Sequence, residues 1–362
     1  MVKKIKLFDP YVNNSEEKAI LSVLKSHLWA AGGNSPHVEK FEKKFAKYVN
    51  TTNCISVNSG TAALHLALSL FNLKNKEVIL PSLSFVSTAH AVLYNDAIPI
   101  FTDIELDTLC VSPKEIEEKI TKKSAVVLPV HFGGMPCKID EILKISKNYR
   151  LKIVEDAAHA VGSKYARKKI GSHGDAVCFS FHPVKNLAMP NGGAITINNK
   201  NQLNSIKKLK ARRWCGITNR KEANYDVNEL GWNFYLNEFS AAIGLEQLKK
   251  LDLITTKRKQ IAKQYHNEIQ ISEKMKYSDE CSYHLFWILV KNRNEFRKKM
   301  KNVGIETGTH YKPIHHMKLY RSKIKLPVTD YVAKKIVTIP IHPNLDKNQI
   351  SSIIKNVNKF AE

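Results

Sequence analysis

The sequence predicts an α/β fold in which helices cover both faces of a mostly parallel central sheet, with a smaller α+β region after it. Three features of the 362-residue chain support this prediction. Apolar, β-branched runs alternate with segments of helical spacing, as in sheets built from strand–helix–strand units. The runs are apolar almost throughout, which is typical of strands buried on both faces. Near residue 250 this alternation gives way to a different pattern.

Seven runs are expected to form the strands of the sheet, with helices between them. The expected strands are CISVN (54–58), EVILP (77–81), IPIFTDI (98–104), SAVVLPV (124–130), LKIVEDAA (151–158), DAVCFSF (175–181) and GAITIN (193–198). The expected helices are TAALHLALSLF, SFVSTAHAVLY, SPKEIEEKI, IDEILKISKNY and NQLNSIKKLKARRW. Ligands of such sheets bind at the carboxyl ends of the strands, so a site is expected among the residues that follow these runs.

The last third of the chain follows another order of elements. A long stretch, NEFSAAIGLEQLKKLDLITTKRKQIAKQYHNEI, has the spacing of one helix or two. After it come the strand-like SYHLFWILV, the helical RNEFRKKMKNVG, the strand-like VTIPIHP and the helical KNQISSIIKNVNKF. We therefore predict a large α/β domain of residues 1–250 and a small C-terminal α+β domain of residues 251–362.

The composition argues against a nucleic-acid-binding, membrane or secreted protein. The formal net charge is +24, carried mostly by lysines in short clusters along the whole chain. Solvated helix faces explain this charge better than a nucleic-acid footprint, because no zinc-finger, helix-turn-helix or RNP-like pattern is present. No run approaches the roughly 20 apolar residues that span a bilayer, and no signal-peptide core is present. We expect a cytoplasmic protein without a membrane or nucleic-acid partner, and six free cysteine thiols.

The first candidate site follows the run CISVN. Ser59, Gly60 and Thr61 stand at a strand-to-helix junction in VNSGTAALHLAL. Free backbone N–H groups and the helix dipole bind phosphate at such a junction, and a threonine hydroxyl can add a donor. An ordinary N-cap that only stabilises the helix is the simpler alternative.

A second candidate site lies at the end of LKIVEDAA, where Glu155 and Asp156 precede His159. A carboxylate in a low-dielectric site is costly unless a cationic or proton-donating partner accompanies it. A helix cap is again the alternative for an isolated Glu-Asp pair. Lys185 favours a site, because it follows the next apolar strand and can meet the carboxylate at the same edge of the sheet.

The lysine gives these signals a common chemistry. An amine is a poor nucleophile at the ordinary lysine pKa of about 10.4, but burial or nearby cations lower that pKa and permit Schiff-base formation. Pyridoxal phosphate requires a lysine for its aldehyde, a carboxylate for its pyridine nitrogen and an anion site for its phosphate. The strand ends supply all three, so pyridoxal phosphate is the simplest hypothesis.

The chain resembles the DegT-type nucleotide-sugar aminotransferases, a family of fold type I pyridoxal phosphate enzymes. The motifs that carry the resemblance follow one another along nearly the whole chain: FEKKFAKYVN, SGTAALHLAL, PSLSFVSTAHAVLYNDAIPIFTDI, LPVHFGGMPCKIDEI, IVEDAAHAVGS, FSFHPVKN, GWNFYLNEFSAAIGLEQL and HYKPIHHMKLY. The resemblance implies the three-layer fold of this enzyme class, pyridoxal 5′-phosphate as cofactor and pyridoxamine phosphate as its intermediate form.

The resemblance also implies roles for single residues around the cofactor ring. Lys185 matches the lysine that binds the cofactor aldehyde and later moves the proton between the cofactor and the sugar. Asp156 matches the partner of the pyridinium nitrogen, and His159 stands where the family has Gln or His near the phenolic oxygen. Phe85 matches the aromatic residue that stacks on the ring, although an aromatic at this place is also common in a core.

Further matches concern the cofactor phosphate. Gly60, Thr61 and Ser180 match phosphate contacts. Asn233 in GWNF matches an asparagine that reaches the cofactor phosphate of the other subunit, which implies a homodimer with shared active sites. A strand-end hydroxyl and a turn residue are the structural alternatives for Ser180 and Asn233.

A third group of residues is matched to the binding of the sugar-nucleotide substrate. His310, Tyr311 and His315 resemble positions that line the entrance for the sugar nucleotide. Arg212 and Arg213 are candidates for holding its diphosphate, because arginine forks suit that anion. His315 and His316 can also be a solvated pair in a loop, and we expect no metal site, because no carboxylate or cysteine stands at ligand spacing from them.

The chain departs from the family pattern in two places. The usual run after the lysine is Thr-Thr-Gly-Glu-Gly-Gly, whereas this chain has LAMPNGG with Pro190 and Asn191. Tyr235 replaces the usual Arg two residues after the family asparagine. Both departures bear on the identity of the substrate, and neither removes the catalytic lysine.

The function that we predict is transamination. An amino acid, by resemblance L-glutamate, donates its amino group to the cofactor on Lys185, and the cofactor then aminates a keto-deoxysugar nucleotide in amino-sugar and polysaccharide biosynthesis. One alternative is a pyridoxamine-phosphate-dependent sugar dehydratase, against which Lys185 argues, because a histidine replaces the lysine in that branch. The other is a non-catalytic regulatory homologue that binds sugar nucleotide or nucleic acid.

Overall fold

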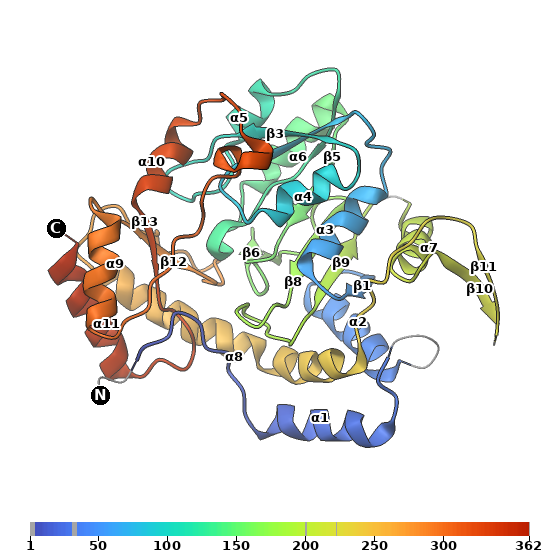
Figure 1. The fold of residues 1–362 in the computed structure, drawn as a ribbon, viewed down its shortest axis with the longest axis horizontal. Coiled ribbons are helices and arrows are strands. Elements are labelled where there is room, and N and C mark those ends of the chain that lie inside the picture. Colours follow the sequence, from blue (N-terminus) through green and yellow to red (C-terminus); the bar gives the residue numbers. More distant parts are fainter. Residues whose placement is uncertain (1–3, 31–34, 200, 222, 362) are drawn as a thin grey trace.

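The computed structural model describes residues 4–30, 35–199, 201–221 and 223–361, and a seven-stranded sheet lies at its centre (Figure 1). The strand order is β1-β9-β8-β5-β4-β2-β3. Strand β9 runs antiparallel to both of its neighbours, and the other neighbouring pairs are parallel. The strands are β1 (Cys54–Val57), β2 (Glu77–Pro81), β3 (Ile98–Thr102), β4 (Ser124–Val127), β5 (Lys152–Asp156), β8 (Ala176–Ser180) and β9 (Gly193–Ile197). The predicted, mostly parallel sheet of seven strands is therefore confirmed.

Helices cover the sheet, and the remaining strands form three small two-stranded sheets. The helices are α1 (Asn14–Ser26), α2 (Pro36–Tyr48), α3 (Gly60–Ser69), α4 (Ser87–Leu93), α5 (Pro113–Glu118), α6 (Ile139–Tyr149), α7 (Gln202–Arg212), α8 (Glu238–Glu268), α9 (Arg293–Asn302), α10 (Pro327–Lys335) and α11 (Lys347–Phe360), with the short 3-10 turns η1 (Phe132–Gly134), η2 (Ile314–His316) and η3 (Lys318–Tyr320). The small sheets pair β6 (Lys164–Tyr165) with β7 (Lys168–Lys169), β10 (Ile217–Lys221) with β11 (Asn224–Val227), and β12 (Phe286–Leu289) with β13 (Ile336–Ile339).

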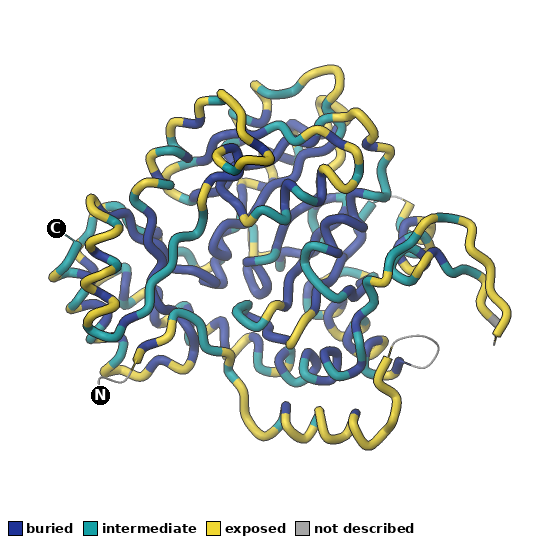
Figure 2. The backbone as a smooth tube through the Cα atoms, viewed as in Figure 1, coloured by how far each residue is buried: buried dark blue, intermediate teal, exposed yellow. Residues whose placement is uncertain are grey.

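Side chains of the central strands alternate between two cores, which makes the fold three-layered. On β5, Ile153 packs into the core that contains α6, whereas Val154 packs into the core that contains α3 and α4. On β8, Cys178 faces α3, whereas Val177 and Phe179 face α2 and the first half of α8. Because successive side chains of a strand point to opposite faces, strands between two layers of helices must be apolar at every position. Figure 2 shows this burial along the sheet, in contrast to the exposed α1 and β10–β11 hairpin.

The C-terminal elements share a core with the large sheet. Helix α8 is continuous over 31 residues, so it crosses the predicted domain boundary after residue 250. Ile79 and Val127 of the large sheet belong to the same buried cluster as Val337 of β13 and Ile353 of α11. In Figure 1 this C-terminal region lies to one side of the sheet, joined to it by α8. The division at residues 250 and 251 stays a prediction.

The strand register brings the predicted site residues to one edge of the sheet. Gly193, the first residue of β9, pairs with Val57 at the end of β1 and with Ser180 at the end of β8. Asp156 ends β5 and pairs with Cys178 of β8. Because β1, β5 and β8 run in the same direction, their carboxyl ends lie side by side, as the sequence predicts.

Two expectations from composition can be compared with the structure. Five of the six cysteines are buried free thiols, and Cys215 is exposed. Within the described ranges, no helix has both the length and the apolar character that crossing a membrane requires.

The aromatic cluster between α2 and the sheet provides a test of the fold. The ring of Phe45 lies 5.6 Å from that of Phe41, 5.1 Å from that of Phe179 and 5.2 Å from that of Phe181, measured between centroids. Phe45→Ala removes these contacts and leaves a cavity, so the free energy of unfolding should fall by about 3–5 kcal/mol. Chemical denaturation followed by circular dichroism measures this change. Tyr149→Ala is the control: its site is 47% exposed, and the expected change is within about 0.5 kcal/mol. Equal losses in the two variants would contradict the packing argument.

Candidate active site

A cavity of about 410 Å³ opens at the carboxyl edge of the large sheet. Its walls come from the ends of β5 and β8, the first turn of α3, the segment before α4 and the segment before η2. The predicted site residues that line it are Gly60, Thr61, Phe85, Asp156, His159, Ser180, Lys185, His310 and Tyr311. Nine residues from five separate stretches of the sequence therefore meet in one pocket.

The first turn of α3 forms one end of the pocket. Ser59 caps the helix: its Oγ accepts the N–H of Ala62 at 3.1 Å, which leaves Gly60 and Thr61 at the start of the helix beside Ser180. A Cβ atom at Gly60 would lie 2.7 Å from Cβ of Ser180, so glycine is required for this approach of helix to strand. Ser59 is thus an N-cap, as the simpler alternative held, and the turn that it caps also faces the cavity, where backbone N–H groups suit an anion.

Asp156 is the buried carboxylate of the pocket. Its residue is 4% exposed, Oδ1 accepts the N–H of Ala158 at 3.1 Å, and Oδ2 lies 2.8 Å from the hydroxyl of Thr88. Burial raises the pKa of Asp156, and the hydrogen bonds and the charge of Lys185 oppose that rise. A carboxyl group held in this way is suited to a ligand that carries a proton-donating cation.

Glu155, its neighbour, takes no part in the pocket. Its Oε2 lies 2.9 Å from Nε2 of His131, and both side chains are fully buried. The two carboxylates stand on opposite faces of β5 because successive residues of a strand alternate. The Glu-Asp pair therefore supplies one carboxylate to the site and one to the core behind it.

Lys185 faces Asp156 from the loop after β8. The loop folds back on itself: the N–H of Lys185 donates to the carbonyl of His182, and the N–H of Met189 donates to the carbonyl of Phe181, both at 2.8 Å. Burial of the amine lowers the pKa of Lys185 to about 8, and the charge of Asp156 opposes this shift. At pH 7 a pKa of about 8 leaves about one-tenth of the amine unprotonated, which is the nucleophilic form.

The hydrogen-bond partners of His159 define its tautomer. The N–H of Gly133 donates to Nδ1 of His159 at 3.2 Å, so the proton of the neutral ring is on Nε2. Nε2 lies 3.0 Å from the hydroxyl oxygen of Tyr311 and can donate to it. Burial lowers the pKa of His159 well below its usual value, which keeps the ring neutral. Burial likewise lowers the pKa of His310 to about 4.

Two further residues predicted for the site do not line this pocket. Asn233 is exposed next to α3, and its carbonyl accepts the side-chain amide of Asn58. The ring of His315 is buried behind the pocket wall, where Nδ1 lies 2.6 Å from Oγ of Ser82. The structure therefore does not place His315 at the substrate entrance of this chain, because Ser82 holds its ring on the far side of the wall.

The two candidate arginines also lie elsewhere. Arg212 pairs with Glu229 at 2.7 Å, and Arg213 pairs with Glu42 at 2.5 Å. Each guanidinium also donates to a backbone carbonyl: Arg212 to that of Ser69 and Arg213 to that of Ser56. Both guanidinium groups have partners within the chain, and neither arginine lines the pocket. Arg212 and Arg213 are therefore poor candidates for binding the diphosphate of a ligand in that pocket.

Two residues that contact Asp156 or Lys185 are not predicted from the sequence. Thr88, in the first turn of α4, contacts Asp156, and Nε2 of His284 lies 3.4 Å from the amine of Lys185. His284 is 2% exposed. Its only signal in the sequence is a histidine inside the apolar run SYHLFWILV, where a core position is the more common explanation.

Asn191, one of the departures from the family pattern, lies on the pocket wall. Its Oδ1 accepts the hydroxyl of Ser240 at 2.7 Å. The contact ties the loop after Lys185 to the first turn of α8. Asn191 thus has a structural partner and also borders the space in which a substrate would lie.

The donor set of the pocket fits pyridoxal phosphate. The amine of Lys185 suits an aldehyde, the carboxylate of Asp156 suits a protonated ring nitrogen, and the turn at Gly60 with the hydroxyls of Thr61 and Ser180 suits a phosphate. The close approach at Gly60, where a Cβ atom would meet Ser180, keeps this last region free of side chains. The residues present therefore match each functional group of the cofactor.

Comparison with known proteins extends this match. Residues 10–358 match the DegT/DnrJ/EryC1/StrS aminotransferase family. The chain is 30% identical to GDP-perosamine synthase of Escherichia coli O157:H7, with 99% of each chain covered. PseC of Helicobacter pylori, an aminotransferase involved in the biosynthesis of pseudoaminic acid, superimposes with a TM-score of 0.93 at 27% identity over 99% of both chains. Spr1654 of Streptococcus pneumoniae in its PLP form gives a TM-score of 0.94 at 25% identity, again over 99% of both chains.

The ionisation of Lys185 provides a test of the site. After reductive methylation with ¹³C-formaldehyde in the absence of cofactor, the NMR signal of Lys185 should titrate near pH 8, whereas surface lysines should titrate near their usual pKa of about 10.4. Asp156→Asn removes the negative charge that raises this pKa, so the midpoint should move further down. A Lys185 signal that titrates together with the surface lysines, or an upward move in Asp156→Asn, would contradict the arrangement.

Proposed function

Because the chain belongs to the DegT/DnrJ/EryC1/StrS aminotransferase family, we propose that it transfers an amino group from L-glutamate to a keto group of a nucleotide-linked deoxysugar. The chain has the PLP fold type I of the sugar aminotransferases and is a pyridoxal-phosphate-dependent enzyme of this class. The single observation that carries the proposal is that Lys185 and Asp156 line the same pocket. Glutamate as donor and a keto-deoxysugar nucleotide as acceptor are our proposals.

Lys185 performs the covalent and proton-transfer work of this chain. When bound, pyridoxal phosphate supplies an aldehyde that condenses with amines and a ring that accepts electrons. Lys185 would hold the aldehyde between turnovers, because a pKa of about 8 leaves its amine partly unprotonated near neutral pH. Once released, Nζ of Lys185 takes a proton from the donor amino acid and returns one to the acceptor. The two substrates therefore bind in turn, which is a ping-pong mechanism.

Asp156 and the first turn of α3 would hold the two ends of the cofactor so that its aldehyde lies next to Lys185. The carboxylate of Asp156 would retain a proton on the ring nitrogen, and its burial and its hydrogen bond from Ala158 fix its position for this role. The hydroxyl of Thr88 orients that carboxylate. At the other end, Gly60, Thr61 and Ser180 bind the phosphate. His159 and Tyr311, which are joined by a hydrogen bond, form part of the pocket wall and would border the cofactor.

The acceptor is proposed to enter along His310 and Tyr311. Both side chains line the cavity, and Phe85, which is 55% exposed, has its ring 5.9 Å from that of Tyr311. The imidazole of His310 and the phenol of Tyr311 suit a sugar ring, which presents apolar C–H groups and hydroxyls together. Phe85 is proposed to stack on the cofactor ring beside them. The aminated nucleotide sugar would then be used in amino-sugar and polysaccharide biosynthesis.

We further propose that the enzyme works as a homodimer with shared active sites. Asn233 is exposed and lies outside the pocket of its own chain, as expected of a residue that serves the other subunit. In that arrangement the partner subunit's Asn233 would complete the phosphate site formed by Gly60, Thr61 and Ser180. Each pocket then depends on two chains, so dimer formation and cofactor binding are linked.

The central test replaces Lys185. Lys185→Ala should lower the rate of glutamate-dependent amination by at least about 100-fold, because it removes both the covalent anchor and the proton carrier. Liquid chromatography with mass spectrometry, applied to a panel of 3-keto and 4-keto nucleotide sugars, measures the product. Borohydride treatment of wild-type protein should fix the cofactor on the peptide that contains Lys185. Lys114→Ala, at a side chain that is 84% exposed, is the matched control. A Lys185→Ala variant that aminates the nucleotide sugar at the wild-type rate would contradict the proposal.

A complementation experiment tests the shared site. Asn233→Ala should bind pyridoxal phosphate about 10- to 100-fold more weakly, the loss expected for one hydrogen bond to a charged group. At limiting cofactor, neither Asn233→Ala nor Lys185→Ala should be active. Dimers reassembled from a mixture of the two should regain activity, because each mixed dimer contains one pocket with both residues intact. No recovery in verified mixed dimers would show that the pockets are not shared through Asn233.

A further inference from the structure

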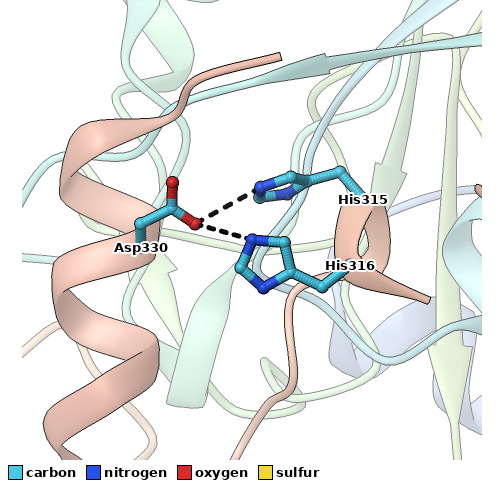
Figure 3. Close-up of side chains that lie close together, drawn as sticks. All are labelled: His315, His316 and Asp330. Atoms are coloured by element: carbon cyan, nitrogen blue, oxygen red, sulfur yellow. Dashed lines mark ion pairs between the residues drawn. The ribbon is translucent and has the colours of Figure 1, made fainter. Parts of the chain in front are cut away.

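Two histidines of η2 and an aspartate of α10 meet outside the active-site pocket (Figure 3). Nε2 of His316 lies 2.9 Å from Oδ1 of Asp330, and Nε2 of His315 lies 3.3 Å from the same oxygen. The three ligand atoms all lie within 4.8 Å of one another. None of these residues lines the cavity that contains Lys185.

Hydrogen bonding does not explain this arrangement. Nε2 of His315 and Oδ1 of Asp330 are both buried, and neither makes a hydrogen bond, although they lie at ion-pair distance from each other. The side chain of His315 is 1% exposed. A buried, unpartnered nitrogen and carboxylate oxygen are costly. A shared cation between the three atoms would satisfy both.

The three donors have the chemistry of a transition-metal site. Imidazole nitrogen and carboxylate oxygen bind Zn²⁺ at about 2.0–2.2 Å, and tetrahedral coordination then separates neighbouring ligand atoms by about 3.3–3.5 Å. The distance of 3.3 Å from His315 to Asp330 meets this requirement, and that of 2.9 Å from His316 would open by a few tenths of an ångström. His316 is half-exposed, so water can occupy the fourth position.

Neighbouring residues hold two of these ligands in place. Nδ1 of His315 lies 2.6 Å from Oγ of Ser82. If Nδ1 donates its proton to that oxygen, Nε2 carries the lone pair, which is the usual arrangement for a metal-bound histidine. On the other side, the carboxylate of Asp103 accepts the N–H groups of Val328 at 2.8 Å and Thr329 at 2.7 Å. These bonds fix the first turn of α10 and therefore the position of Asp330.

We propose that His315, His316 and Asp330 bind one divalent transition-metal ion of the Zn²⁺ type, which joins η2 to α10. The proposal replaces the expectation of no metal site, which rested on the lack of a carboxylate near the two histidines in the sequence. Asp330 supplies that carboxylate from a separate helix. The ion has a structural role: it anchors the end of the segment that carries His310 and Tyr311 into the pocket.

The test measures zinc binding to the purified, cofactor-loaded protein. All proteins carry Cys215→Ser, because Cys215 is the exposed thiol and can bind zinc by itself. After dialysis against a chelator, isothermal titration with ZnCl₂ should give one ion per chain, and bound Zn²⁺ should raise the melting temperature. Co²⁺ in place of Zn²⁺ should give the visible bands of tetrahedral coordination by nitrogen and oxygen.

Two ligand variants and a control make the test specific. Asp330→Asn and His316→Gln, at partly exposed positions, should each weaken binding of Zn²⁺ by more than about tenfold and abolish the melting shift. His27→Asn, at an exposed histidine in the left-handed conformation, should bind as the parent does. Binding that persists unchanged in Asp330→Asn, or a parent protein that binds no zinc at micromolar concentration, would show that the cluster is only an imidazole–carboxylate contact.

Discussion

The buried carboxylate of Asp156 is the constraint on which the rest of the site depends. A carboxylate that is 4% exposed is costly unless its surroundings compensate for the lost water. The backbone of Ala158, the hydroxyl of Thr88 and the charge of Lys185 do so in part. The same burial that raises the pKa of Asp156 lowers that of Lys185. Burial in one cavity thus prepares both groups for complementary tasks: Asp156 favours a protonated ring nitrogen, and Lys185 keeps part of its amine unprotonated near neutral pH.

The three-layer architecture decides which residues can reach that cavity. Neighbouring residues of β5 face opposite layers, so Asp156 is in the site while Glu155 pairs with His131 in the core. The antiparallel strand β9 brings Gly193 beside the ends of β1 and β8, and this register aligns the α3 turn with Ser180. Small residues are required at this junction: a Cβ atom at Gly193 would lie 2.4 Å from the carbonyl oxygen of Ser59. The anion site therefore depends on backbone packing as much as on polar side chains.

One segment between the C-terminal elements serves two regions of the molecule. Its first part places His310 and Tyr311 on the pocket wall. Its second part, η2, turns away, and the backbone and hydroxyl of Ser82 hold Ile314 and His315 against the end of β2. Because Ser82 lies just before the loop that carries Phe85, the proposed metal site and the substrate side of the pocket share a support. The position of η2 relative to α10 can therefore influence the pocket without any contact with the cofactor.

The sequence by itself determined the seven central strands and the gathering of polar residues at their carboxyl ends, because apolar periodicity and the parallel-sheet rule constrain both. The resemblance to a family, not periodicity, added the pocket residues Phe85, His310 and Tyr311. Strand periodicity could not determine which of Glu155 and Asp156 faces the pocket, since this depends on the register of β5 between two layers. The choice of Asp156 came from the resemblance to a family. His284 and Thr88 were missed because contacts across more than 60 positions leave no local pattern. Asp330 was separated from His315 and His316 for the same reason, and the internal partners of Arg212 and Arg213 were equally hidden. Only tertiary packing decides such pairings, because it alone brings donors from distant segments to hydrogen-bonding or ligand distance.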